Sequence, residues 1–150
     1  MVVTREVIIP TGMEILYEKY HYCPGIRIGN TVYVSGQVGR DENLQVVEGI
    51  EAQFVQAFEN VNKVLLTAGV TFEDVVEMVT YHVTSPASVP GDNASNMASG
   101  SQSLIIPHLL LFMEVKDRYF IHKYPTWTKV GVTALSDPRL IVEIKCTALR

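Results

Sequence analysis

The sequence lacks the features that mark metal-binding, secreted and membrane-spanning proteins. Its two cysteines, Cys23 and Cys146, lie too far apart to form a zinc-ligand pattern or a disulfide framework. No stretch approaches the roughly 18 apolar residues of a membrane span, and residues 1–10 lack the apolar core of a signal peptide. We therefore expect a cytoplasmic protein with no metal, no bound cofactor and no membrane partner.

Positive charge is also scarce. Twelve Lys and Arg residues face 16 Asp and Glu residues, which gives a net charge of −4, and the basic residues are scattered along the chain. Nucleic-acid binding needs clustered basic residues that displace counterions, so we expect no nucleic-acid partner. A Gly-rich phosphate loop, an HExxH motif and a Gly-x-Ser-x-Gly elbow are all missing. The isolated histidines are typical of structural residues: His21, His82, His108 and His122.

The patterns that are present predict one α+β domain over residues 1–150. A length of 150 residues with 47% hydrophobic residues is typical of a single domain. After a short first strand at 7–9, the predicted order is β-β-α-β-α-β-β, with two helices on one face of a mixed sheet. The later strands are predicted at 26–28, 31–37, 75–83, 128–135 and 140–148, and the helices at 47–68 and 108–120.

The face of each element follows from its periodicity. In the first helix, apolar residues recur at helical spacing on one face, and Gln53 is assigned with the charged residues to the other face. In the strand at 75–83, Val75, Val79, Tyr81 and Val83 are assigned to one face. Residues 84–107, rich in Ser, Pro, Asn and Gly, show no period and are predicted to be a flexible insertion.

The order of motifs resembles the YjgF/RidA (Rid) superfamily. The resemblance rests on residues 22–30, on Val34-Ser35-Gly36-Gln37-Val38-Gly39, on the helix that contains residues 57–61, and on residues 124–132. The segment Tyr-Pro-x-Trp-Thr-x-Val-Gly-Val resembles in particular the YjgH-like branch, which lacks the catalytic arginine. Nearly the whole chain except 84–107 takes part in the resemblance.

The resemblance implies a chorismate-mutase-like fold that assembles as a homotrimer, with ligand clefts between subunits. A sheet with helices on one face leaves its other face to be buried by association. Six residues are candidates for that second face: Tyr33, Lys129, Gly131, Thr133, Glu143 and Lys145.

The resemblance also implies a site. RidA-type members hydrolyse reactive imines and enamines to keto acids and ammonia, and an arginine after the Pro corner holds the substrate carboxylate. Here that position is Trp127, the family's cysteine is Lys129, and its late acidic residue aligns with Lys145. The candidate catalytic residues are Tyr22, Ser35, Lys129 and Glu143, and the candidate cleft residues are Gly36, Gln37, Tyr124, Trp127, Thr128 and Lys145.

These departures shape the functional prediction. An indole offers a flat apolar wall that suits an aromatic or cationic ligand better than a carboxylate, or it simply packs. We predict a homotrimer that binds a small metabolite and lacks the usual imine deaminase activity. The alternative is an imine or enamine deaminase with an unusual substrate, and a third possibility is an interaction protein that works through residues 84–107.

Overall fold

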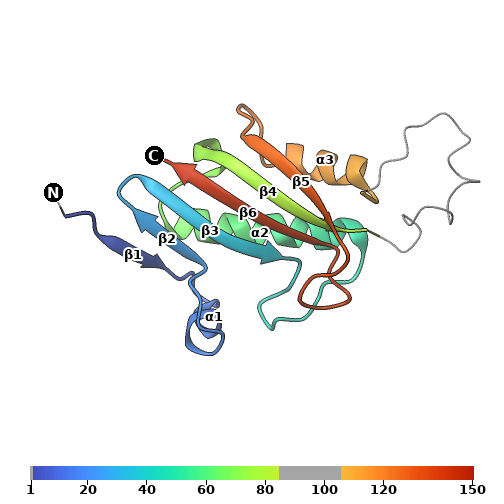
Figure 1. Ribbon diagram of the computed structural model, residues 1–150, viewed down its shortest axis with the longest axis horizontal. Coiled ribbons are helices and arrows are strands. Elements are labelled where there is room, and N and C mark those ends of the chain that lie inside the picture. The colour runs from blue at the N-terminus through green and yellow to red at the C-terminus, as the bar shows by residue number, and fades with distance from the viewer. Residues whose placement is uncertain (1, 85–105) are drawn as a thin grey trace, which may run out of the picture.

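The computed structural model describes residues 2–84 and 106–150, in which six strands form one mixed sheet (Figure 1). The strand order is β1-β2-β3-β6-β4-β5, and all neighbours are antiparallel except β4 and β5. The bounds are β1 Arg5–Ile8, α1 Glu14–Glu18, β2 Gly25–Ile28, β3 Thr31–Val38, α2 Ile50–Thr67, a 3-10 turn Phe72–Asp74, β4 Val75–Val83, α3 Leu109–Asp117, β5 Thr126–Val132 and β6 Val142–Leu149.

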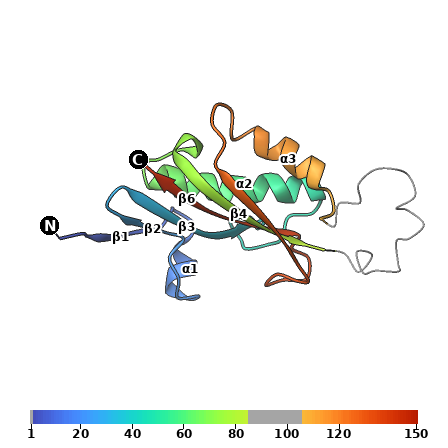
Figure 2. The same ribbon diagram turned by 45° about the horizontal axis from the view of Figure 1, so that its top comes forward.

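The predicted fold class is confirmed, because α2 and α3 lie on the same face of this sheet (Figure 2). Gly29 has a φ of 58° and makes the tight β2–β3 turn. The chain leaves α2 through Gly69, where the Gly69 and Val70 amides donate to the carbonyls of Leu66 and Leu65 at 2.9 and 3.0 Å. This Schellman ending turns the chain back toward the sheet.

The core lies between the two helices and the sheet. Phe58, on α2, is completely buried, with its ring centroid 5.4 Å from that of Phe112 on α3 and 4.9 Å from that of Tyr119. Cys146 on β6 is also buried, as its alternating pattern predicts, and burial raises the pKa of its thiol to about 12. The Phe112 ring also lies edge-on to that of His82 on β4, with 4.8 Å between centroids, so the aromatic contacts join the helices to each other as well as to the sheet.

The pairing of strands is irregular at two places, and one of them shows that a predicted strand face is wrong. The pairing of β4 with β6 shifts between Val75 and Glu77, so Val75 lies in the core, whereas Val79 lies on the opposite face. Assigning Val75 and Val79 to one face was therefore wrong, because a bulge breaks the period of two. A second shift lies in β3 between Val34 and Gln37.

Other differences concern bounds and one buried polar residue. The short helix α1 was not predicted, since five residues are too few to show a helical period. The strand predicted at 128–135 is β5, which begins and ends earlier, at Thr126–Val132. Gln53 is 4% exposed rather than on the polar face, because its amide accepts from the Ile141 amide and donates to the Arg139 carbonyl.

The face of the sheet opposite α2 and α3 is called the open face below. It contains Val79 and Tyr81 on β4, Glu143 and Lys145 on β6, and Thr128 on β5. Within residues 2–84 and 106–150, no helix is long and apolar enough to cross a membrane. The insertion predicted at 84–107 lies almost entirely outside the described residues.

Candidate functional site

The first group of candidate residues lies at the β3 bulge. Ser35 Oγ donates to the Cys23 carbonyl at 2.6 Å, and the Ser35 amide donates to the Pro24 carbonyl at 2.9 Å. The buried Gln37 side chain donates to the Ser35 carbonyl at 3.1 Å. These bonds tie the segment before β2 to the bulge and hold Tyr22 beside it. Ser35 is therefore bonded to the two residues that follow Tyr22 in the chain.

Glu143 reaches the same bulge from β6. It pairs with Val38 on β3 and its side chain lies across Gly36, where a methyl group would be 2.7 Å from the Glu143 carboxyl carbon. Only a glycine leaves room for the carboxyl group at this point. Burial raises the pKa of Glu143 above its usual value, and the nearby Arg40 partly opposes this effect.

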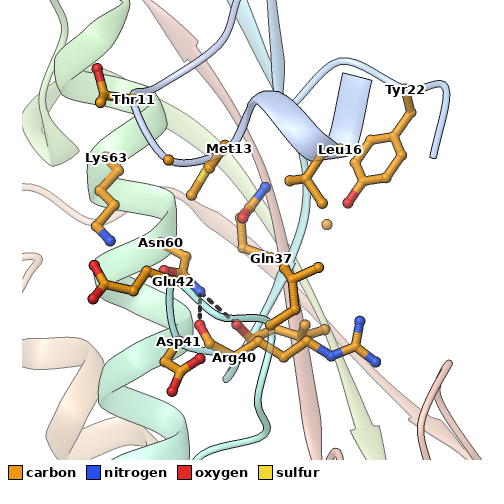
Figure 3. A pocket seen from close by; sticks show the side chains of 14 residues that line it. Thr11, Met13, Leu16, Tyr22, Gln37, Arg40, Asp41, Glu42, Asn60 and Lys63 are labelled. Carbon is orange, nitrogen blue, oxygen red and sulfur yellow. Dashed lines mark hydrogen bonds between the residues drawn. The ribbon is translucent and has the colours of Figure 1, made fainter. Parts of the chain in front are cut away.

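A pocket of about 100 Å³ adjoins the bulge (Figure 3). Its lining includes Tyr22, Gly36, Gln37 and Arg40. Burial and then the Glu143 charge raise the pKa of Tyr22, while Arg40 lowers it. Tyr22, Arg40 and Glu143 therefore lie close enough to affect one another's charge, and these three residues with Gly36 are called the bulge site below.

Arg40 was not among the sequence candidates. Its backbone is held by Asn60, a buried residue of α2 whose amide nitrogen donates to the carbonyls of Val38 and Arg40 at 2.8 Å each. The dashed lines in Figure 3 mark these two bonds. The signal in the sequence is that Arg40 is the first cation after the Ser-Gly-Gln turn, but its approach to Glu143 depends on the sheet pairing.

The second group lies away from the bulge, near α3. In the parallel β4–β5 pairing, Trp127 is opposite Met78, Lys129 is opposite Thr80, and Gly131 is opposite the buried His82. These β5 residues therefore project to the helix side of the sheet. Assigning Lys129 and Gly131 to the open face was wrong, because the predicted strand was displaced and its pairing with β4 was not foreseen.

Thr128 and Lys145 do lie on the open face, where both are paired with Val79. Thr133 follows the end of β5 and is outside the sheet. Tyr33 on β3 is opposite Thr147 and is 48% exposed. The structure thus separates the candidates into the bulge site, the open face and the α3 side.

Trp127 is partly buried: it contacts several residues of its own chain and also lines, with Lys116 and Tyr124, an open pocket of about 350 Å³. Its indole N–H donates to Thr80 Oγ1 at 2.9 Å. The ammonium nitrogens of Lys129 and Lys116 lie 4.1 and 5.4 Å from the indole ring centroid. Lys116 also contacts the ring of Tyr124, at 5.1 Å. These contacts favour packing as the role of Trp127, because its donor is used and two lysine cations already lie against its ring.

Thr80, which accepts the hydrogen bond from Trp127, makes a second hydrogen bond inside the core. Thr80 Oγ1 lies 2.7 Å from His82 Nε2, and since Trp127 donates to Thr80, the Thr80 hydroxyl can donate to the histidine. This arrangement requires a neutral ring at His82. Burial, and then the charge of Lys129, lower the pKa of His82 to about 4.

One chain therefore brings Tyr22, Ser35, Gly36, Gln37 and Glu143 together and leaves Tyr124, Trp127 and Lys129 elsewhere. Among the described residues, no cluster of three or more His, Cys, Asp or Glu could hold a metal ion. The polar groups of the bulge site can orient a small polar molecule and exchange a proton with it at Glu143.

Comparison with known proteins gives consistent matches. The family described as endoribonuclease L-PSP matches residues 14–92. The chain is 33% identical to the RutC family protein YjgH of Escherichia coli over 135 residues, which covers 89% of this chain and 88% of that protein. It is 37% identical over 59 residues to a 2-iminobutanoate/2-iminopropanoate deaminase of Dermatophagoides farinae, which covers 38% of this chain and 46% of that protein.

Solved structures agree with these sequence matches. The structure of the protein YjgH superimposes with a TM-score of 0.74 at 30% identity and covers 98% of this chain and 97% of that one. RidA from a Psychrobacter species superimposes with a TM-score of 0.68 at 28% identity, over 86% of this chain and 88% of the other.

Replacing Gly36 tests the close approach of Glu143. In Gly36→Ala the new methyl group should push the Glu143 carboxyl toward solvent, so its pKa should fall toward the usual value for glutamate. Because a flexible side-chain end can move aside, the free energy of unfolding should drop by less than about 1 kcal/mol. Carboxyl ¹³C NMR reports the pKa, and Glu143→Gln identifies the resonance. An unchanged Glu143 pKa would contradict the contact.

The neutral state of His82 predicts a pH-dependent stability. The unfolded chain takes up a proton at His82 near the ordinary pKa of 6.5, whereas the folded chain does so only near 4. Stability should therefore fall as the pH drops from about 6.5 to 4, and less so in His82→Gln. Denaturant unfolding at several pH values measures this, with the exposed His122→Gln as control. Equal pH slopes in all three proteins would refute it.

Proposed function

The chain belongs to the endoribonuclease L-PSP (YjgF/RidA) family, and from this premise we propose that it binds a small metabolite at the bulge site, in a cleft completed by a neighbouring subunit of a homotrimer. The observation that carries the proposal is the pocket beside the bulge, which Tyr22 and Arg40 line and near which Glu143 lies close enough to affect the pKa of Tyr22. Pockets with a few convergent polar groups are typical of small-molecule sites.

The separation of the predicted site residues into distant groups within one chain supports the homotrimer. The bulge site and the α3 side are separate in one chain, so a single cleft that contains both needs a second copy. The open face also exposes or half-buries several apolar side chains, among them Tyr33, Val79 and Tyr81. Burying them between copies would contribute roughly 25 cal/mol for each Å² of apolar surface removed from water.

A small molecule fits the site better than RNA, although the family's description names an endoribonuclease. The net charge of −4 provides no basic field for a phosphate backbone. The pocket volume of about 100 Å³ suits a molecule of a few heavy atoms rather than a nucleotide chain.

Glu143 favours a second candidate function, the hydrolysis of an imine or enamine. In this reaction a proton is added to the substrate, water attacks the C=N carbon, the oxygen stays as a carbonyl and the nitrogen leaves as ammonia. A carboxyl group with a raised pKa can supply the proton and take one back from water. The relative named as an imine deaminase agrees with this chemistry but covers only part of the chain.

The homotrimer proposal predicts the effect of a charge at the centre of the open face. Light scattering should give three times the chain mass of 16.7 kDa for the wild type and one chain mass for Val79→Glu. Because the cleft needs its neighbour, Val79→Glu should also lose the NMR shifts that 2-oxobutanoate causes in the wild type. Leu66→Glu, on the helix side, is the matched control. A monomeric wild type that binds the keto acid would reject the shared cleft.

The hydrolysis proposal predicts ammonia release from freshly generated 2-iminobutanoate above the uncatalysed rate. Glu143→Gln should lower kcat about a hundredfold, because general acid–base help is removed while the side-chain shape stays. The exposed Glu51→Gln should match the wild type. Hydrolysis at this site is rejected if the wild type shows no turnover, or if Glu143→Gln and Trp127→Ala both leave turnover unchanged. The binding proposal is then judged only on the NMR shifts that 2-oxobutanoate causes.

A further inference from the structure

The pocket beside the bulge continues to the helix side of the sheet. There Gln37 lies on the core face of β3 and is 5% exposed. Segments of the same chain at α1 and α2 form the walls, so this part of the pocket is complete without a neighbouring subunit. It is called the α1–α2 half below and is lined by Met13, Leu16, Gln37, Leu44, Asn60 and Lys63.

The amide group of Gln37 has hydrogen-bonding capacity left over. Its nitrogen carries two protons, of which the Ser35 carbonyl accepts one at 3.1 Å, and within residues 2–84 and 106–150 no donor bonds to its oxygen. In the described part of the chain, Arg40 Nε is the only fully buried side-chain atom without a partner, so the unbonded Gln37 oxygen is not sealed off and reaches the pocket. Figure 3 shows the amide group directed toward Met13 and Leu16.

The neighbouring amide and carboxylate groups are already bonded. The amide nitrogen of Asn60 donates to two main-chain carbonyls at 2.8 Å each, and its oxygen accepts from Gln56 at 3.0 Å. The Asp41 carboxylate accepts from two backbone amides of its own loop at 2.9 Å each. Gln37 is therefore the buried side chain that has both an acceptor and a donor to offer a ligand in this half.

The rest of the lining sets the size and the charge of the ligand. Met13, Leu16 and Leu44 present apolar side chains, which suit a hydrocarbon body. The charged residues of the whole pocket are two cations and two anions: Arg40, Lys63, Asp41 and Glu42. Because these charges balance, the pocket favours an uncharged ligand, and its volume of about 100 Å³ limits that ligand to a few heavy atoms.

We propose that the α1–α2 half binds a small uncharged cyclic amide, a lactam, through the free hydrogen-bonding groups of Gln37. A lactam ring holds its N–H and its C=O on one edge. The N–H donates to Gln37 Oε1, and the lactam carbonyl accepts the second proton of Gln37 Nε2. The methylene groups of the ring lie against Met13 and Leu16, where they are removed from water.

This site differs from the bulge site in the groups and in the number of chains that it needs. The bulge site takes its polar groups from Tyr22, Arg40 and Glu143 and, as proposed, is completed by a neighbouring subunit. The α1–α2 half uses Gln37, which lies on the core face of β3, and walls from one chain. The inference therefore goes beyond the proposed function, and either one can fail while the other stands.

The test compares two isomers. 2-Piperidone and N-methyl-2-pyrrolidinone have the same formula and a similar size, but only 2-piperidone has an N–H group. Both are titrated into ¹⁵N-labelled protein and followed by NMR. The wild type should bind 2-piperidone about tenfold more tightly, because the other isomer leaves the Gln37 oxygen without a donor. Gln37→Met keeps the length of the side chain without its amide, so it should bind the two isomers within about twofold of each other.

Substitutions in α1 locate the ligand. Leu16→Trp fills the α1–α2 half and leaves Gln37 in place, so it should abolish the shifts that 2-piperidone causes. Ile15→Trp is the matched control and should bind like the wild type, because Ile15 is 38% exposed and does not line the pocket. Val79→Glu should keep 2-piperidone binding, since the site lies within one chain. Thermal unfolding verifies that each variant is folded.

The inference is rejected if the wild type does not bind 2-piperidone, if it binds both isomers equally, or if Gln37→Met keeps the preference for 2-piperidone. It is also rejected if Leu16→Trp binds 2-piperidone as the wild type does, because the ligand then lies elsewhere. Loss of 2-piperidone binding in Val79→Glu rejects it as well, because the site then needs a neighbour. The proposed function is judged separately, on the shifts that 2-oxobutanoate causes in the wild type and in Val79→Glu.

Discussion

Between Val34 and Gln37, β3 advances three residues while β6 advances two, and this mismatch sets the position of every polar group at the bulge site. The extra residue turns Gln37 into the core, where it bonds the Ser35 carbonyl, and leaves Gly36 beneath Glu143. A regular strand would put these side chains on alternating faces and would separate them. The close approach of Glu143 to Gly36, and with it the burial that raises the pKa of Glu143, depends on that one irregularity.

In the segment Tyr124 to Trp127, which follows α3, contacts within the chain occupy a position where the family resemblance implies a functional residue. At the place where the family resemblance implies an arginine, Trp127 packs against two lysine ammoniums and donates its N–H to Thr80. These contacts connect β5 to α3 and to the buried His82. Arg40, on the loop after β3, is the arginine that lines the pocket beside the bulge.

The sequence was informative where periodicity is local. The α2 stripe, the β2–β3 turn at Gly29 and the bounds of β4 could all be predicted, and the order of the elements indicated a mixed sheet with two helices on one face. The faces of Val75, Lys129 and Gly131 could not, because bulges and strand pairing depend on residues far apart in the chain. The same reason hid Arg40, since its partners at the site come from three separate segments.

The way Asn60 holds the loop after β3 has an evolutionary consequence. Its two hydrogen bonds are made to main-chain carbonyls, and every amino acid supplies such a carbonyl. The side chain at position 40 can therefore be exchanged without loosening the loop that presents it. The lining of the pocket at this position is thus free to diverge under selection while the scaffold around it is inherited unchanged.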